Sequence, residues 1–392
     1  MSIITKLYKN VGLLDTIFPY YQRLPNVLHR IVAKEFARKA HQEIRKHSLP
    51  NRLTFFVTNK CNLRCSHCFY IDELNSRVHE LDIDEISALA SSLKGNVSQL
   101  VLTGGEAFLR EDLADIVRVF EQLAGIESAS ILTSGFFPQR VEKTVREITQ
   151  KTSLALNFQI SIDGVKQKHN AIRKNTKSFD NAFQTIDVLQ GLRRANDNIG
   201  RISTLTTLGR SNYDDIERII AELSQLEKVS YGFTFARSTI RDISGTFNRE
   251  QLSGFEPGED VCLTVEQMKE SYKRIEECLW SKSKASLFYG ENKAILRNLI
   301  RLKETNFESS FKCMAGITDF IIYPNGDVAL CEMFQPFGSL EKYDFNVQSF
   351  WEKEYESYKK TVLGCKCTHS CNIASMIKYD KDELYDLFSH QR

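Results

Sequence analysis

Short apolar stretches alternate with amphipathic helical patterns in this chain, and this alternation limits its fold more than any other feature. Six stretches predict strands, at residues 53–58, 99–102, 128–132, 154–162, 201–207 and 229–235. Helical patterns lie between them, at residues 82–93, 112–123, 139–151, 179–196 and 213–226. Asp82 and Asp112 are suitable helix N-caps. Such alternation indicates an α/β fold with a parallel sheet, in which ligands gather at the carboxyl ends of the strands.

Three cysteines follow the first predicted strand in a C-x3-C-x2-C array. Cys61, Cys65 and Cys68 lie within eight residues, so one loop can turn all three sulfurs toward one point. Soft thiolates select zinc or an iron–sulfur cluster over hard cations. A structural zinc site would need a fourth ligand, from His67 or from a distant residue. A cubane cluster held by three cysteines would instead leave one iron open.

The second predicted strand ends in Thr103-Gly104-Gly105-Glu106. Glycines allow a close backbone approach, and a carboxylate can pair with an ammonium group. After the cysteine array, this turn resembles that of the radical S-adenosylmethionine (radical SAM) superfamily. The resemblance implies a partial (β/α)6 barrel of the TIM type, a 4Fe–4S cluster on the three cysteines, and S-adenosylmethionine as cofactor. It also implies that the Gly-Gly-Glu turn holds the methionyl ammonium group.

The fourth predicted strand also ends in polar residues. In the stretch Ser161-Ile162-Asp163-Gly164, Ser161 and Asp163 lie on one side because side chains alternate along a strand, and they are candidates for binding the cofactor's ribose. Relatives in the family carry a similar stretch, followed by a histidine and an arginine spaced like His169 and Arg173. The arginine resembles the residue that pairs with the methionyl carboxylate.

Five further sites draw attention near the predicted strand ends. Thr133-Ser134-Gly135 stands where relatives often have T-N-G, so its serine departs from the family pattern. His67 and Phe69 flank the last cysteine of the array and are expected to pack over the cluster. Arg237 and Tyr231, at the sixth strand, are candidates for substrate contact. The sequence names no catalytic acid, base or radical quencher.

The C-terminal third carries a second group of cysteines around a predicted hairpin. An apolar strand at residues 320–323 is followed by Pro324-Asn325-Gly326-Asp327, a hairpin turn sequence. Pairing of the two strands would bring Cys313 and Cys331 together. The remaining cysteines of the group follow a predicted helix at residues 351–360 and are Cys365, Cys367 and Cys371. Five clustered cysteines imply another metal site.

The spacing C-x12-G-x4-C around Gly326 resembles the opening of the SPASM/twitch extension of radical SAM enzymes. A full SPASM domain has more cysteines, so the resemblance implies one auxiliary 4Fe–4S cluster here. Its expected ligands are Cys313, Cys331, Cys367 and Cys371. Cys365 is either an alternative ligand or a nearby thiol. A zinc site is the alternative to the cluster.

We expect four regions along the chain. Residues 1–49 form a basic, aromatic-rich helical extension, residues 50–245 the barrel, residues 246–308 bridging helices, and residues 309–392 the auxiliary cluster domain. Apolar positions recur at helical spacing in the extension, at Val27, Leu28, Ile31, Val32 and Phe36. These positions predict a helical cap on the barrel with a solvated basic face. Contact with a membrane surface or an acidic substrate is the alternative.

Composition limits the partners of the protein. The 392 residues include 52 Lys and Arg against 50 Asp and Glu, and this balance argues against binding of nucleic acid through its phosphates. No run of about eighteen apolar residues and no signal peptide pattern is present, so we expect a cytoplasmic protein. In that compartment ten cysteines indicate metal ligands rather than disulfides.

The resemblance implies a radical SAM enzyme of the oxidoreductase type. An electron, from a reductant such as flavodoxin or ferredoxin, would cleave S-adenosylmethionine to methionine and a 5′-deoxyadenosyl radical that abstracts hydrogen from the substrate. The short N-terminal extension and the single auxiliary cluster favour a small, carbohydrate-like substrate for oxidation, epimerisation or rearrangement. Maturation of a ribosomally made peptide is the alternative. A non-catalytic zinc-binding scaffold is a more distant one.

Overall fold

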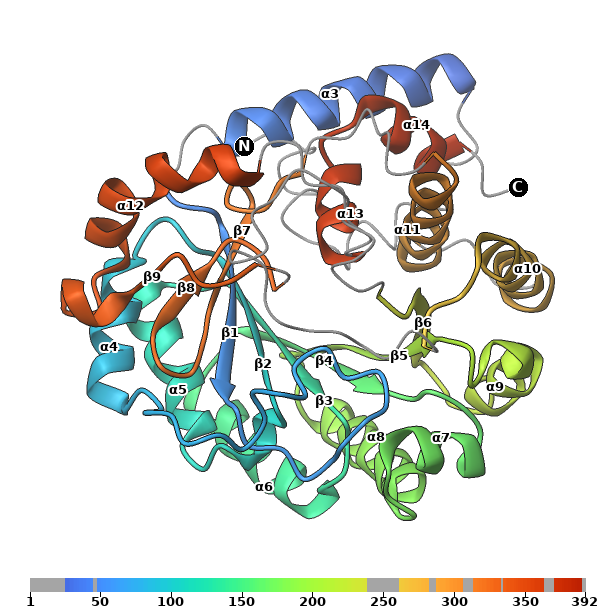
Figure 1. Ribbon diagram of the computed structural model, residues 1–392, viewed down its shortest axis with the longest axis horizontal. Coiled ribbons are helices and arrows are strands. Elements are labelled where there is room, and N and C mark those ends of the chain that lie inside the picture. Colours follow the sequence, from blue (N-terminus) through green and yellow to red (C-terminus); the bar gives the residue numbers. More distant parts are fainter. Residues whose placement is uncertain are drawn as a thin grey trace.

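The computed structural model describes residues 25–44, 48–237, 261–281, 287–305, 313–332, 334–362 and 370–389. Six strands of this part follow the predicted order: β1 (Arg52–Thr58), β2 (Gln99–Gly104), β3 (Ser128–Thr133), β4 (Ala155–Ser161), β5 (Ile199–Leu208) and β6 (Ser230–Phe235). Each pairs in parallel with the next. Figure 1 shows the sheet curling, with helices outside it. The predicted α/β partial barrel is confirmed.

Helices connect the parallel strands and cover the outer face of the sheet. They are α4 (Ile83–Ser92), α5 (Leu113–Val119), α6 (Pro138–Lys151), α7 (Lys166–Arg173), α8 (Ser178–Ala195) and α9 (Ile216–Leu223). Leu53 and Phe55 of β1 are buried in the main core together with Leu100 and Leu102 of β2. Phe56 points to the inner face and packs in a separate cluster, as the two-residue period of a strand requires.

The two predicted N-caps differ. Asp82 accepts hydrogen bonds from the backbone of Asp84 and Glu85 and completes a capping box, so this prediction is confirmed. Asp112 occupies the N-cap position of α5, as predicted, but its side chain makes no capping bond. Its carboxylate instead accepts a hydrogen bond of 2.5 Å from Arg110 Nε, because a nearby guanidinium is a stronger partner than a helix amide.

The predicted hairpin is confirmed, and it extends the barrel sheet. Its strands are β7 (Asp319–Ile322), β8 (Asp327–Ala329) and β9 (Gly338–Ser339). β7 pairs in parallel with β1, whereas β8 and β9 add in antiparallel fashion. The order of the described sheet is therefore β6-β5-β4-β3-β2-β1-β7-β8-β9. The hairpin thus lies beside the strand that leads into the cysteine array.

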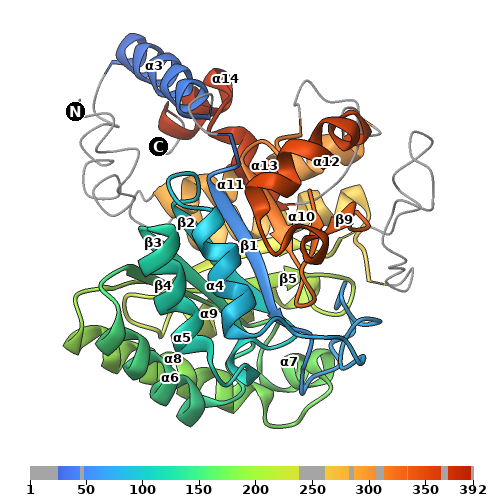
Figure 2. The same cartoon turned by 90° about the vertical axis from the view of Figure 1, so that its left-hand side faces the viewer.

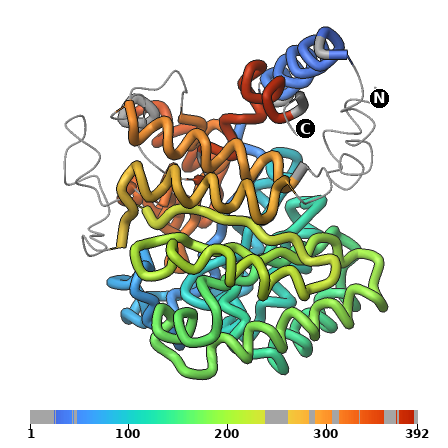
Figure 3. Tube along the Cα trace, turned by 90° about the vertical axis from the view of Figure 1, so that its right-hand side faces the viewer, coloured from blue at the N-terminus to red at the C-terminus, as the bar shows by residue number. Residues whose placement is uncertain are grey.

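Five more helices surround the sheet: α10 (Val265–Ile275), α11 (Leu287–Glu304), α12 (Val347–Val362), α13 (Ser370–Ile377) and α14 (Lys381–Ser389). In Figure 3, α10 and α11, yellow to orange, lie between the green helices of the barrel and the red C-terminal helices. Asn292 of α11 accepts a hydrogen bond from the backbone amide of Phe233 at 3.1 Å and donates one to its carbonyl at 2.7 Å. This side chain therefore pairs with the edge of β6.

Helix α3 (Asn26–Ile44) packs on α14, and Figure 2 shows both at the end of the molecule where β1 begins, away from the strand's carboxyl end. Its buried face consists of His29, Ala33, Phe36, Ala37 and Ala40. The predicted helix is confirmed, but its apolar face was predicted incorrectly: Val27 and Ile31 are 69% and 58% exposed. Small alanines make the contact because they let two helices approach closely. In the described residues, no helix is long and apolar enough to cross a membrane.

Candidate cofactor and cluster site

The three cysteines of the array lie on the segment between β1 and α4, residues 59–80, which we call the cysteine loop. Asn59 donates to the carbonyls of Glu73 at 3.1 Å and Ser76 at 2.9 Å. Asn75, in the left-handed conformation with φ 61°, accepts from the amide of Cys61 at 3.0 Å and donates to its carbonyl at 3.1 Å. The two asparagines thus shape the loop without any metal.

The Gly-Gly-Glu turn packs against the base of the cysteine loop. A Cβ atom on Gly104 would lie 2.2 Å from the carbonyl oxygen of Thr58, and one on Gly105 would lie 2.3 Å from that of Lys60. The amide of Gly105 donates to Thr58 and that of Glu106 to Lys60, at 2.9 and 2.8 Å. Glycine is therefore required at both positions because this turn packs directly against the backbone of residues 58–60.

The Glu106 side chain is buried and directed at the end of β3. Its carboxylate accepts hydrogen bonds from the Thr133 hydroxyl at 2.7 Å, the Ser134 amide at 2.8 Å and the Ser134 hydroxyl at 2.5 Å. Ser134, which departs from the T-N-G pattern of the family, therefore contacts the Gly-Gly-Glu turn. The role of Gly104, Gly105 and Glu106 toward a methionyl group stays a prediction.

A buried ion pair lies beneath the cysteine loop. Asp163, after β4, and Arg173, at the end of α7, are joined by an Oδ2–Nη2 distance of 2.5 Å. Arg173 also donates to the sulfur of Cys65 at 3.5 Å. Burial opposes both charges, but the Arg173 charge holds the pKa of Asp163 below its usual value, and the Asp163 charge raises the pKa of Arg173. The structure thus brings Cys65 of the cysteine array together with Asp163 and Arg173, which were predicted from the stretch after the fourth strand.

Two histidines border this ion pair. His67 Nε2 lies 3.6 Å from the Asp163 carboxylate, and burial lowers the pKa of His67. The ring of His169 accepts from the amide of Asp163 at 3.1 Å, and its other nitrogen bonds to the Ser178 hydroxyl at 3.1 Å. Burial, reinforced by the Arg173 charge, lowers the pKa of His169 to about 4. His169 is therefore a neutral positioning residue for Asp163.

The donor set of the cysteine loop suits an iron–sulfur cluster. Burial raises the pKa of Cys61 to about 12 and that of Cys68 to about 11, so these thiols keep their protons until a metal displaces them. The described residues contain no His, Cys, Asp or Glu group already gathered as a metal site. The Nε of Arg173 and Oδ2 of Asp163 are buried and lack a hydrogen bond of good geometry. These atoms and the three soft sulfurs fit a cluster with a polar cofactor beside it.

The remaining predicted residues lie nearby or outside the described parts. Ser161 is the last residue of β4 and half-buried. Tyr231 makes an edge-on contact with Tyr289. Cys313 is half-buried and Cys331 is buried. Cys365 and Cys367 lie outside the described residues, as does the side chain of Cys371 at the start of α13. The auxiliary ligand set stays a prediction.

Sequence reasoning missed Glu332, which follows Cys331. Arg237, after β6, forms an ion pair of 2.5 Å with Glu332 and lies over the ring of Phe69 at 4.3 Å. Strand β6 is at one edge of the sheet and β8 is next to the other. This ion pair therefore connects the two sides of the barrel opening, and the Phe69 ring of the cysteine loop lies against its guanidinium group. In the sequence, Glu332 could have been noticed only because it follows Cys331, a predicted cluster ligand.

Comparisons with known proteins agree with this arrangement. A sequence model of the radical SAM superfamily matches residues 55–223, from β1 to α9. GTP 3′,8-cyclase of Moorella thermoacetica is 32% identical over 120 residues, which cover 30% of this chain and 36% of that protein. The chain thus spans about a third of the length of this relative.

Other similarities reach the C-terminal third. The antilisterial bacteriocin subtilosin biosynthesis protein AlbA of Bacillus subtilis is 22% identical over 339 residues, covering 82% of this chain and 66% of that protein. The crystal structure of Streptococcus suis SuiB bound to S-adenosylmethionine has the same fold, with a TM-score of 0.55, 12% identity, and coverage of 82% of this chain and 71% of that one. Residues 55–223 therefore form a radical SAM domain, and the described chain shares its fold with SuiB.

Proposed function

We propose that the substrate of this radical SAM enzyme is a peptide. The observation that carries this proposal is the reach of the similarity: the cyclase matches less than a third of the chain, whereas AlbA matches 82% of it. AlbA is a bacteriocin biosynthesis protein, and SuiB, which shares the fold, has been solved with the precursor peptide SuiA. The hairpin lies at the barrel opening, where a substrate would enter.

A 4Fe–4S cluster and S-adenosylmethionine are the cofactors of the radical SAM superfamily, and hence of this chain. When bound and reduced, the cluster supplies the electron that cleaves S-adenosylmethionine to methionine and a 5′-deoxyadenosyl radical. Cys61, Cys65 and Cys68 are the proposed ligands. The asparagine-shaped loop presents these thiols at the carboxyl end of β1.

The buried polar residues around the loop would hold S-adenosylmethionine. Arg173 is the proposed partner of the methionyl carboxylate, because its buried Nε lacks a hydrogen bond and Asp163 is the one carboxylate paired with it among the described residues. Glu106, with the two glycines before it, is the proposed partner of the methionyl ammonium. Ser161 and Asp163 are proposed for the ribose side, where β4 ends.

We further propose one auxiliary 4Fe–4S cluster at the C-terminal cysteines. Cys313 and Cys331 flank β7 and β8, and Cys371 begins α13. These three residues, with Cys367 or Cys365, would supply four thiolates, which is the usual ligand number for such a cluster. A flavodoxin or a ferredoxin would supply electrons. The enzyme would then act as an oxidoreductase on the peptide.

A small-molecule substrate is the second candidate. It is favoured by the higher identity to GTP 3′,8-cyclases, which reaches 38% over 96 residues with the enzyme of Limosilactobacillus fermentum. That match covers only 23% of this chain and 28% of the relative. A match over so small a part of both chains says less about the substrate than one that covers most of this chain.

A substrate-dependent cleavage assay tests the proposal. The full chain, reconstituted anaerobically with iron and sulfide, would be given dithionite, S-adenosylmethionine and a short peptide encoded beside its gene. We expect formation of 5′-deoxyadenosine and a mass change in the peptide, both absent with Cys61→Ala. Deuterium transfer from labelled peptide into 5′-deoxyadenosine would identify the carbon attacked. Deuterium transfer from a sugar nucleotide but not from the peptide would contradict the proposal.

A further inference from the structure

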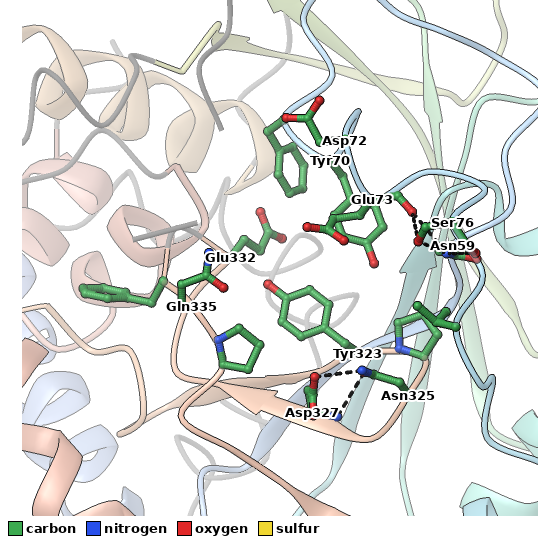
Figure 4. Close-up of a pocket in the computed structure, with 15 residues that line it drawn as sticks. Asn59, Tyr70, Asp72, Glu73, Ser76, Tyr323, Asn325, Asp327, Glu332 and Gln335 are labelled. Atoms are coloured by element: carbon green, nitrogen blue, oxygen red, sulfur yellow. Dashed lines mark hydrogen bonds between the residues drawn. The ribbon is translucent and has the colours of Figure 1, made fainter. Parts of the chain in front are cut away.

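A cavity of about 260 Å³ lies between the cysteine loop and residues 313–339, which we call the hairpin segment. Figure 4 shows Tyr70, Asp72 and Glu73 of the loop facing Tyr323 and Glu332 of the hairpin segment across this space. The cavity adjoins Phe69, which directly follows the last cysteine of the array. A group bound here would therefore lie beside the proposed cluster without occupying the residues proposed for S-adenosylmethionine.

The side chains that line the cavity carry charge of one sign. Four of them are carboxylates, Asp72, Glu73, Asp327 and Glu332, and no Lys, Arg or His lines it within the described residues. Asp327 is held in place by a hydrogen bond of 2.7 Å from Asn325. Glu332 is balanced by Arg237 at 2.5 Å. The three other carboxylates have no ion pair with a described basic side chain, so the cavity has a net negative potential.

Two tyrosines add an aromatic wall to the acidic one. The rings of Tyr70 and Tyr323 are stacked, with centroids 6.1 Å apart and an angle of 14° between their planes. In Figure 4 the Tyr323 hydroxyl faces the cavity beside Glu332 and Gln335. Burial and the Glu332 charge raise the pKa of Tyr323 well above its usual value, which agrees with a negative field at that hydroxyl. Aromatic faces and carboxylates both attract cations.

We infer that this cavity binds a positively charged side chain of the substrate, of the lysine or arginine class. The inference rests on the proposed peptide substrate and narrows it to a peptide with a basic residue near the modified position. An alkyl chain would lie along the two rings, and its ammonium or guanidinium group would meet Asp72, Glu73 and the Tyr323 hydroxyl. Nucleoside triphosphates and other anions would be repelled by the same carboxylates.

The binding test compares two probes that differ by one terminal ammonium group. N-acetyl-lysine methylamide and neutral N-acetyl-norleucine methylamide would be titrated into the full reconstituted chain, without S-adenosylmethionine or reductant, and followed by saturation-transfer NMR. We expect the lysine probe to bind at least about fivefold more tightly at low salt. This preference should shrink at 0.5 M salt, because exposed charges are then screened.

Charge removal assigns the preference to the cavity. Asp72 and Glu73 are exposed, so the double variant Asp72→Asn/Glu73→Gln keeps the fold, and we expect it to reduce the preference to less than about twofold. Glu222→Gln/Glu227→Gln removes the same charge from exposed positions on and after α9 and should leave the preference unchanged. Equal binding of both probes, or an undiminished preference in Asp72→Asn/Glu73→Gln, would overturn the inference. Because no turnover is needed, these outcomes are separate from loss of peptide-dependent 5′-deoxyadenosine, which would refute the proposed function.

Discussion

The two cysteine-bearing regions lie on neighbouring strands but are held in different ways. Polar contacts shape the cysteine loop, through Asn59 and Asn75, above the buried pair of Asp163 and Arg173. Aromatic rings hold the hairpin, where Trp351 of α12 stacks on Tyr355 and packs against Phe320 of β7 and against Phe337. The comparison teaches that directional bonds and charge fix the first region, whereas packing fixes the second. Polar substitutions should therefore damage them unequally.

Removal of the first three thiols separates the two regions most sharply. We expect the variant Cys61→Ala/Cys65→Ala/Cys68→Ala to form no 5′-deoxyadenosine and to keep about four irons per chain, because a separate set of four thiolates can hold its own cluster. Iron analysis and chromatography of the assay mixture measure both quantities. Cys278→Ala, which changes a thiol outside both groups, should keep both. Loss of all iron from the triple variant would show that the C-terminal cysteines bind no independent cluster.

Neutralising one carboxylate in each region compares a fully buried ion pair with a partly exposed one. Asp163→Asn leaves Arg173 buried without its partner and should lower the free energy of unfolding by about 3–5 kcal/mol. Glu332→Gln leaves Arg237 with access to water, so we expect a loss of about 1 kcal/mol. Urea unfolding of the metal-free chain measures both values. Equal losses would mean that the two regions do not differ in the way described.

Acid should destabilise the first region through His169. Its folded pKa of about 4 lies below the unfolded value of about 6.5, so the unfolded chain binds the extra proton between these pH values. Stability should thus fall with decreasing pH over this window, by roughly 3 kcal/mol at most from this group. His169→Asn, measured by urea unfolding from pH 7 to pH 4, should flatten the dependence. Residues 313–339 of the hairpin segment contain no histidine, so this segment has no equivalent source of acid sensitivity. If the dependence of stability on pH were unchanged in His169→Asn, His169 would be excluded as its source.

Glycine substitutions give the smallest predicted difference between the regions. Gly105→Ala would place a Cβ 2.3 Å from a backbone oxygen, whereas Gly338→Ala would place one 2.7 Å from the Phe350 ring. We expect losses of about 3 and about 1 kcal/mol, because a ring yields more readily than a backbone. Gly191→Ala, in α8 with nothing within 4 Å, should gain about 0.5–1 kcal/mol from helix propensity. Thermal unfolding reports all three, and a greater loss at Gly338 would reverse the comparison.

The features predicted correctly are those that local sequence determines. The strands follow from apolar runs, the Asp82 cap from its S/T/D-x-x-E pattern, and the hairpin from its Asn-Gly turn. The grouping of Asp163 with Arg173 was reached through the family resemblance, and the structure adds the contact of Arg173 with Cys65. Strand patterns do not specify partners, so the pairing of β7 with β1 could not be predicted.

Long-range contacts account for the rest. The Asp112 carboxylate accepts a hydrogen bond from Arg110 and none from a helix amide. Helix α3 is buried mainly through its alanines, whereas Val27 and Ile31 are exposed. The acidic cavity joins residues 260 positions apart, from Asp72 to Glu332. The cysteine loop and the hairpin segment share no sequence motif. Only the folded structure therefore shows that their carboxylates line one cavity.

The pairing of Asn292 with β6 restricts how a peptide can be recognised. An open sheet edge would offer a row of amides and carbonyls to which an extended peptide could add as another strand. At Phe233 both groups are already satisfied by one side chain. Because α11 packs on β6 and Asn292 occupies both groups of Phe233, neither an extended peptide nor the edge of a second copy could pair with the main chain at this residue. Recognition there must depend on the peptide's side chains, so its selectivity would follow residue identity rather than backbone conformation.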